Sequence, residues 1–485
     1  MSNAIEGLQP SLVWKYFSAI SNIPRGSGNE KAVSQFVLDT AAKLGLEAKR
    51  DKHLNVVVKK RACAGKEQVP SLCLQGHLDM VCEKNKDTTH DFLKDPIELV
   101  REGNVLRANG TTLGADNGVA VATNLAIMED TTLVHGPLEF LFTVDEERGL
   151  TGANSLKSEF VVSKTLMNLD SEEEGALYVG CSGGRNTLGT WKLKWESVPR
   201  GAVCFAVRVR GLKGGHSGLE IDKGRGNSLK LVNRVLLQLV ALGVRLSHLE
   251  GGNKSNAIPR EAEALCFVAK KNFGKAKKLG SQFNAIAKSE LATVEPNLEI
   301  VIEEMPSPKG AKVMNKNLAL SMLQTISALP HGVIKMSADI PGLVETSTNV
   351  AIVRTGAKAL ELTTSQRSSV ASELTEILQT VGHTIQLGGG KASHTEGYPG
   401  WKPDMNSAIL KIARETYRHL TGKESHVKAI HAGLECGIIG EKYPGIDMVS
   451  FGPTLEGVHS PDEKIYIDTV EKFWNFLLAI LRNVN

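Results

Sequence analysis

Cysteine is scarce in this chain, and its positions argue against a disulfide framework. Seven cysteines are scattered over 485 residues, no two of them form a Cys-x-x-Cys pair, and their number is odd. This usage is typical of buried thiols in a reducing compartment, whereas small secreted domains carry even numbers of closely spaced cysteines. We therefore expect a cytoplasmic protein.

Long hydrophobic runs are missing as well. No stretch of the sequence approaches the roughly 20 apolar residues that are needed to cross a bilayer. The first 17 residues lack a basic region followed by a continuous apolar segment, so we expect no secretory signal. The sequence predicts no membrane partner.

The chain also lacks a strong excess of one charge. Lysine and arginine number 57 and aspartate and glutamate 53, which leaves a net charge of +4. Binding to nucleic acid would require basic residues gathered on one face. The lysines between residues 270 and 278 are more typical of the solvated face of a helix, and we expect no nucleic-acid partner.

What the sequence does contain is an alternation of strand and helix patterns. Its length allows two or three domains of roughly 100–200 residues each. In the first third, apolar residues recur at helical spacing over 29–44 and 119–128, and short apolar runs at 72–74 and 138–144 indicate buried strands. Such alternation favours an α/β fold in which helices cover both faces of a mixed, mostly parallel sheet.

The pattern changes after the glycine-rich segment at 180–184. Strand and helix signals then follow the order of a βαββαβ unit, the ferredoxin-like arrangement, and a second similar pass extends to residue 381. The α/β alternation resumes beyond residue 406. We therefore expect a catalytic domain in two segments, residues 1–185 and 395–485, with a ferredoxin-like lid and dimerisation domain, possibly duplicated, inserted at 186–394.

A polar pair ends the apolar strand that begins at residue 72. His77 and Asp79 lie two residues apart, so an extended chain projects both side chains to the same face. In open α/β sheets the ends of strands are where ligands bind. The pair suits a metal-binding imidazole whose other ring nitrogen is held by a carboxylate. A structural His–Asp hydrogen bond is the simpler alternative for the pair alone.

Further apolar runs end in residues of the same chemical type. Taken singly, Asp170 is typical of a helix N-cap, Glu146 and Glu147 of a charged loop, and His459 of an exposed turn. Together with Asp116, however, the segments supply two imidazoles and several carboxylates. This mixture is the ligand set of zinc, cobalt or manganese, and two-metal hydrolases commonly share one bridging carboxylate. Neighbouring carboxylates can divide the roles of metal ligand and general base.

These segments carry a family resemblance that runs nearly from end to end. The strings that support it are GTTLGADNG, NLDSEEEG, GLKGGHSG, NAIPREA, YPGW, HAGLECG and GVHSPDE. The chain resembles the zinc-dependent peptidase/aminoacylase superfamily and, within it, the bacterial aminoacyl-histidine dipeptidases, or cytosolic non-specific dipeptidases. The order and spacing of the segments make the resemblance specific.

The resemblance implies a site for two divalent metal ions, with zinc expected first and cobalt or manganese as alternatives. His77 and Asp170 would bind one ion, Glu147 and His459 the other, and Asp116 both.

Two further roles at the metals are implied in the same way. Asp79 would orient His77. Glu146 would act as the general base that activates a metal-bridging water, and later as proton donor to the leaving amine. A cis peptide bond is implied between Asp116 and Asn117.

The resemblance also implies residues that contact the substrate. His216 would reach the partner subunit's site in a homodimer formed through the lid and stabilise the oxyanion. Asn256 and Arg367 would hold the substrate's terminal carboxylate, and Glu435 its amino group. On sequence alone, Arg367 equally suits a surface salt bridge. The glycine-rich segment around His216 lacks the Lys-Ser/Thr ending of a phosphate-binding loop.

The implied activity is hydrolysis of the peptide bond of unblocked dipeptides, including Xaa-His dipeptides such as carnosine. Two alternatives stay open. An N-acyl amino acid deacylase would use the same metals. A non-catalytic ligand-binding module would keep the architecture but lose a metal ligand or the base, whereas all of those positions hold residues of the required type.

Overall fold

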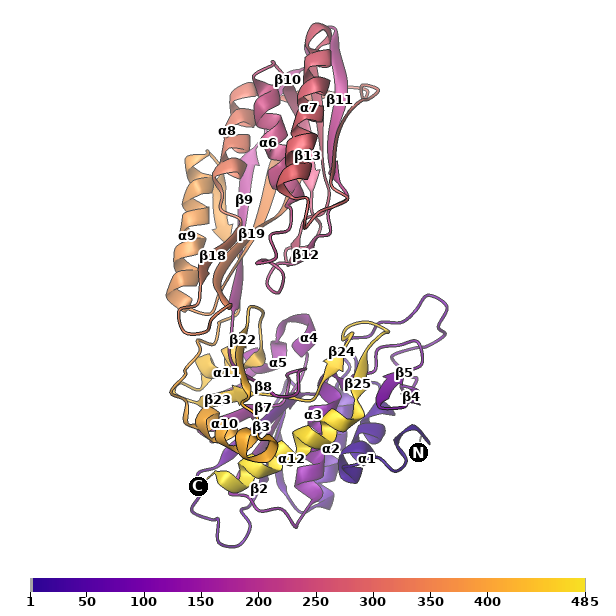
Figure 1. Cartoon of the computed structure of the whole chain (residues 1–485), viewed down its shortest axis with the longest axis vertical. Helices are drawn as coiled ribbons and strands as arrows, with labels where there is room; N and C mark the ends of the chain where they lie inside the picture. The colour runs from indigo at the N-terminus through magenta and orange to yellow at the C-terminus, as the bar shows by residue number, and fades with distance from the viewer. Residues whose placement is uncertain (1–2, 485) are drawn as a thin grey trace. The chain divides into compact units, whose positions relative to one another are not determined.

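The computed structural model describes residues 3–484 and divides into two compact units (Figure 1). The first comprises the chain up to residue 180, 403–429 and the part from 434 onward, and the second comprises 181–402 and 430–433. Residues 181–185, 395–402 and 430–433, expected in the catalytic domain, therefore group with the second unit. Residues 1, 2 and 485 belong to the expected domains but lie outside the described residues. No helix among the described residues is long and apolar enough to span a bilayer.

A mixed eight-stranded sheet forms the centre of the first unit. Its four central strands, β6, β3, β7 and β23, run parallel, whereas β1, β2 and β8 pair antiparallel with their neighbours. The expected mixed sheet is thus present, with parallel pairing at its centre. In sheet order the strands are β1 (Glu47–Arg50), β2 (Val56–Lys60), β6 (Leu138–Thr143), β3 (Leu72–His77), β7 (Thr165–Asn168), β23 (Asp447–Ser450), β8 (Ala176–Cys181) and β22 (His426–Ile430).

Burial explains why the central strands read as continuous apolar runs. Every residue of β3 and β6 is buried, as expected for strands covered on both faces. Helix α3 packs against β3, α2 against β1 and β2, and α10 against β23. The helices of this unit are α1 (Ser11–Ser21), α2 (Lys31–Lys43), α3 (Ala115–Glu129), α4 (Glu146–Gly149), α5 (Thr151–Ser155), α10 (Ala408–Thr421), α11 (Glu435–Lys442) and α12 (Ile467–Asn483), after a short 3₁₀ turn, η1 (Asn3–Ile5).

A small second sheet of the first unit joins its two ends in sequence. Its order is β24 (Leu455–Glu456), β25 (Lys464–Tyr466), β5 (Val105–Ala108) and β4 (Leu99–Glu102). The turn between β24 and β25 carries His459. Pairing of β25 with β5 thus brings a late segment of the chain beside the segment that precedes α3.

The second unit is built from two ferredoxin-like halves that share one antiparallel sheet. One half has the strand order β16-β11-β15-β13 and the other β21-β9-β20-β19. Because β9 precedes the whole first half in sequence, that half is inserted after the first strand of the other. The strands are β9 (Gly183–Lys192), β11 (Ala202–Arg210), β13 (Arg245–Gly251), β15 (Ala262–Ala269), β16 (Glu299–Glu304), β18 (Gly332–Met336), β19 (Val344–Thr355), β20 (Ala359–Ser368) and β21 (Lys391–His394).

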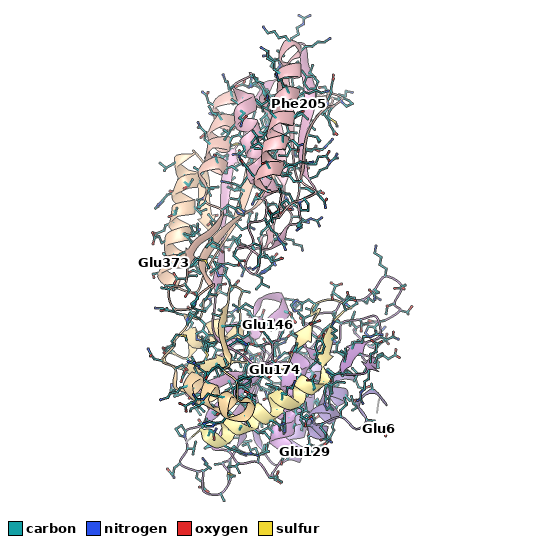
Figure 2. All side chains as sticks on the ribbon, viewed as in Figure 1. Glu6, Glu129, Glu146, Glu174, Phe205 and Glu373 are labelled. Atoms are coloured by element: carbon teal, nitrogen blue, oxygen red, sulfur yellow. The ribbon has the colours of Figure 1, made fainter. Side chains whose placement is uncertain are left out.

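Four helices pack against this sheet and bury its apolar face (Figure 1). They are α6 (Ser228–Val240), α7 (Lys270–Glu290), α8 (Lys316–Ala328) and α9 (Ala371–Leu387). Phe205 of β11 is fully buried in the resulting core (Figure 2). The side chain of Asn227 accepts a hydrogen bond from the backbone N–H of Lys230 and so caps α6.

Two pairs of short strands complete the second unit. β10 (Trp195–Ser197) pairs with β17 (Lys312–Met314), which joins the two ends of the inserted half. β12 (Gly215–His216) pairs with β14 (Ala257–Ile258).

Candidate metal centre

Three neighbouring parallel strands end at the same edge of the central sheet. β3 ends at His77, β6 ends three residues before Glu146, and β7 ends two residues before Asp170. Because these strands are adjacent in the order β6-β3-β7, their carboxyl ends lie side by side. This edge is where open α/β sheets bind ligands.

One cluster of metal-type ligands surrounds His77. Its Nε2 lies 3.1 Å from Asp116 Oδ1 and 3.4 Å from Asp170 Oδ1. One ligand atom from each of the three residues lies within 4.8 Å of the others. The imidazole is buried, and Asp170 is 8% exposed. This spacing allows the three residues to share one cation.

A second cluster contains His459 and shares Asp116 with the first. His459 Nε2 lies 3.1 Å from Asp116 Oδ2 and 3.0 Å from Glu147 Oε2. Asp116 therefore faces one histidine with each of its two carboxylate oxygens. That is the arrangement of a carboxylate bridging two ions.

Asp79 connects the first cluster with the neighbouring turn. It has no exposed surface, and its Oδ1 lies 3.3 Å from His77 Nδ1. Its carboxylate also accepts hydrogen bonds from Ser27 Oγ and from the backbone N–H groups of Glu146 and Glu147. Although burial raises the pKa of Asp79, these partners lower it to about 2. The ionised Asp79 thus contacts both the His77 ring and the first turn of α4.

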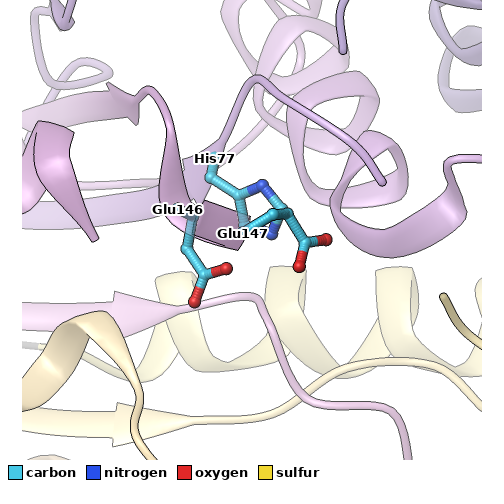
Figure 3. A group of neighbouring side chains, drawn as sticks. All are labelled: His77, Glu146 and Glu147. Atoms are coloured by element: carbon cyan, nitrogen blue, oxygen red, sulfur yellow. The ribbon is translucent and has the colours of Figure 1, made fainter. Parts of the chain in front are cut away.

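Glu146 and Glu147 are the first two residues of α4, and their side chains lie beside His77. Figure 3 shows their carboxyl groups extending past the imidazole, one on either side of it in this view. Ligand atoms of all three residues lie within 4.8 Å of one another. Burial raises the pKa of Glu146 well above its usual range, and nearby Asp170, Glu435 and Glu147 add to this while His77 opposes it. A carboxyl group in these surroundings is suited to accept and release a proton. Figure 2 places Glu146 among the side chains of the first unit.

The donor set fits divalent metal ions. Glu147 Oε1 is buried and has no hydrogen-bond partner among the described residues. Hydrogen bonds to Asp116 and Glu147 raise the pKa of His459 to about 11. Although burial lowers the pKa of His77, the surrounding carboxylates raise it well above the usual range. Buried carboxylates in such number require positive charge, which divalent cations supply.

The backbone around these ligands adopts unusual conformations. Asp145 and His459 have φ values of 52° and 62° in the left-handed region, which non-glycine residues seldom occupy. The peptide bond between Asp116 and Asn117 is cis, as the resemblance implied.

His216 and Arg367 lie close together in the second unit. His216 Nδ1 accepts hydrogen bonds from the backbone N–H groups of Gly218 and Leu219. Burial and the charge of Arg367 lower the pKa of His216 to about 4, so the ring is neutral. The other ring nitrogen, Nε2, lies 3.5 Å from Arg367 Nη2. When Nδ1 is the acceptor, the single proton of the neutral ring lies on Nε2.

Asn256 and Arg367 are both part of the second unit but have different surroundings. Asn256 and His216 line a cleft of about 1150 Å³ whose walls also carry Arg208, Arg210 and Arg260. Arg367 is buried in β20, its Nη1 donates to Tyr398 Oη at 2.8 Å, and its Nε has no partner among the described residues. This burial excludes the surface salt bridge considered from sequence.

Glu435 does not offer a surface to a substrate in this structure. It has no exposed area, and its Oε2 accepts hydrogen bonds from Gln75 Nε2 at 2.6 Å and Thr143 Oγ1 at 2.7 Å. Gln75 in turn accepts a hydrogen bond from Asn168. Glu435 thus belongs to a polar network with Gln75 and Thr143, while its Oε1 has no hydrogen-bond partner among the described residues, and its expected contact with the substrate's amino group stays a prediction. Burial raises its pKa to about 7.

Several residues around the centre were not expected from sequence. Gln75 and Tyr398 contact expected site residues, and Arg25 and Glu463 bind the backbone around them. Two of them carried a signal in strings that support the family resemblance. Glu463 stands in GVHSPDE, four residues after His459, and Tyr398 stands in YPGW.

Comparisons with known proteins agree with this geometry. Residues 73–483 match the model of peptidase family M20/M25/M40. The chain is 40% identical over 478 residues to a cytosol non-specific dipeptidase of Escherichia coli, covering 98% of each chain. The crystal structure of an aminoacylhistidine dipeptidase from Vibrio alginolyticus matches with a TM-score of 0.92 and 39% identity, covering 99% of this chain and 98% of the other. A tripeptidase from Staphylococcus aureus shares the fold, with a TM-score of 0.59 and 18% identity. This match covers 98% of the present chain and 99% of the tripeptidase.

Proposed function

Because the chain belongs to peptidase family M20/M25/M40, we propose that it is a metal-dependent dipeptidase that acts on unblocked dipeptides, Xaa-His dipeptides included. The observation that carries the proposal is the pair of ligand clusters sharing Asp116. The two relatives near 40% identity, a non-specific dipeptidase and an aminoacylhistidine dipeptidase, support a dipeptide as the substrate. The name of the E. coli relative and the scattered cysteines support a cytoplasmic location.

We assign the metal ligands from the two clusters. His77 and Asp170 would hold one ion, Glu147 and His459 the other, and Asp116 would contact both. Zinc suits this combination of imidazole and carboxylate, and cobalt or manganese would also be accepted. When bound, the ions polarise the peptide carbonyl and lower the pKa of the attacking water.

The protein residues then move the proton. Glu146 takes a proton from the attacking water and returns it to the leaving amine, a role that suits a carboxyl group shielded from solvent. Asp79 keeps the His77 ring in a fixed orientation throughout. His216 Nε2–H donates to the oxyanion.

We assign recognition of the substrate's terminal carboxylate to Arg367 and Asn256. A guanidinium can give a carboxylate two parallel hydrogen bonds, and Arg367 still has an unpartnered Nε among the described residues. Requiring that carboxylate, together with a free amino group, would restrict the enzyme to short unblocked peptides.

A substrate panel tests the proposed activity. We expect Ala-His to be hydrolysed at least about tenfold faster than acetyl-His in kcat/KM, because a preference of about 1.4 kcal/mol for the free amino group already gives that ratio. Both compounds are assayed by release of free histidine with the zinc-loaded enzyme. Preference for acetyl-His would identify a deacylase instead, and hydrolysis of neither would favour a binding module.

Homodimerisation through the second unit is part of the proposal, with His216 completing the partner's site. We expect that mixing equal amounts of His216→Ala and Glu146→Ala chains, each inactive alone, restores about a quarter of wild-type activity, because half of the randomly paired dimers contain one intact site. Subunit exchange is followed by differently tagged chains. Failure to regain activity despite exchange would show that His216 does not act in the partner.

A further inference from the structure

The carboxylate of Glu463 binds four consecutive backbone N–H groups. Its Oε2 accepts from Leu113 at 2.7 Å and Gly114 at 2.9 Å, and its Oε1 accepts from Ala115 at 2.8 Å and Asp116 at 3.2 Å. Glu463 is 2% exposed, so this carboxylate is satisfied by the loop alone rather than by solvent. The loop it holds ends in Asp116, the residue that faces both histidines.

The same loop is held from its carbonyl side by a buried arginine. Arg25 is 2% exposed and donates to the backbone carbonyls of Leu78, at 3.0 Å, Asp79, at 2.9 Å, and Gly114. A Cβ atom on Gly114 would lie 2.6 Å from Arg25 Nη2, and φ at Gly114 is +69°. Glycine is therefore required where the loop passes between the two charged side chains.

Both charged residues connect parts of the centre that are distant in sequence. Glu463 follows His459 in the turn between β24 and β25, whose shape is fixed by the hydrogen bond from Ser460 Oγ to the Gly457 carbonyl. Arg25 joins the segment after His77 to the Asp116 loop. The Asp116 loop is thus connected to the His77 segment through Arg25 and to the His459 segment through Glu463.

From these contacts we infer that Glu463 and Arg25 are positioning residues that clamp the Asp116 loop and set the separation of the two metal ions. The inference rests on the proposed dimetal site. Neither residue touches the reacting atoms, and both act through the backbone that carries Asp116. Amide groups bound to a carboxylate form strong, directional hydrogen bonds, so the loop is fixed before any metal arrives.

Metal binding by Glu463→Gln tests the clamp. The amide keeps the size of the side chain but presents an NH₂ group to two backbone donors that need an acceptor. We expect the affinity for Zn²⁺, measured by competition with a chromophoric chelator, to fall by about 10–100-fold, as is usual when a group that orients metal ligands is lost. The visible absorption of the Co²⁺-loaded variant should shift, because the geometry at Asp116 changes. Glu463→Asp, which keeps the charge, should recover part of the affinity.

The matched control is Glu456→Gln, which alters an exposed carboxylate on β24 of the same hairpin. Its Zn²⁺ affinity and Co²⁺ spectrum should equal those of the wild type. Wild-type affinity and spectrum in a folded Glu463→Gln variant would overturn the inference.

Hydrogen exchange in the metal-free wild-type protein separates the clamp from the metal site and needs no variant. We expect the amides of 113–116 to exchange at least about tenfold more slowly than those of the exposed turn residues Lys86 and Asp87, because the carboxylate protects them without metal. Equally fast exchange would overturn the clamp whatever the metal content. Slow exchange in a protein that binds no Zn²⁺ would leave the clamp intact and refute the proposed dimetal function.

Discussion

Replacing Glu146 by alanine should lower kcat by about 10²–10⁴-fold, the usual effect of removing a general base. The bound metal should remain, because neither ligand cluster around Asp116 includes Glu146. Burial beside other carboxylates raises the pKa of Glu146, which is the property expected of a group that must take a proton and return it. Steady-state kinetics on Ala-His and metal analysis of the same preparation measure the two quantities separately.

The control for this variant is Glu441→Gln, which changes an exposed carboxylate on α11 of the same unit. It should retain wild-type kcat and metal content. A Glu146→Ala enzyme with near-wild-type kcat would show that another group activates the water. Loss of metal from that variant would mean that Glu146 is a ligand.

Replacing Asp116 by asparagine should have a comparably large effect through the metals. The carboxamide cannot offer an anionic oxygen to each cluster, although it preserves the volume of the side chain. We expect at most one tightly bound Zn²⁺ per chain and a fall in kcat/KM of about 10³-fold or more, since transition-state stabilisation by metals amounts to several kcal/mol. Atomic absorption after gel filtration and dipeptidase kinetics measure the outcome.

The comparison for Asp116→Asn is Asp87→Asn, an exposed aspartate of the first unit. It should bind metal and turn over substrate as the wild type does. Two tightly bound ions in the Asp116→Asn protein would contradict the bridging assignment, because each cluster would then be complete without that carboxylate.

The residues that cluster at the centre were more visible in the sequence than the groups that support them. A polar residue at the end of an apolar strand is visible as a pattern, and His77 and Asp170 were found in this way. Arg25 and Glu463 make their contacts with backbone atoms of distant segments. Backbone atoms are the same for every residue, so no spacing or composition marks their partners. The burial of Glu435 was not expected, because it follows from the packing of α11 and not from the string in which the residue stands.

Fold prediction was limited in a similar way. The buried strand β6 was visible because four of its six residues are Leu or Phe. The amphipathic pattern of residues 227–242 predicted α6 to within two residues at each end. The strands β9 and β22, by contrast, were not recognised. β22 has no fully buried residue and lies at the edge of its sheet, so its pairing, rather than its own sequence, holds it in place. The Asp116 segment was also expected to precede its helix, whereas α3 includes it with non-helical torsion angles.

The position of β9 has a consequence for how the second unit assembles during synthesis. β9 leaves the ribosome before the inserted half, but its neighbours β20 and β21 follow only after that half is complete. Within the inserted half, β16, β11, β15 and β13 pair with one another in that order, so these pairings involve only strands that are synthesised before β19 and β20. When β10 then pairs with β17, the chain between them is closed into a loop. This pairing places the start of α8 near the end of β9. β20 and β21 are therefore synthesised when the chain leading to them already lies near β9. Most of the loop-closure entropy for their pairing with β9 has then been lost in the earlier β10–β17 pairing.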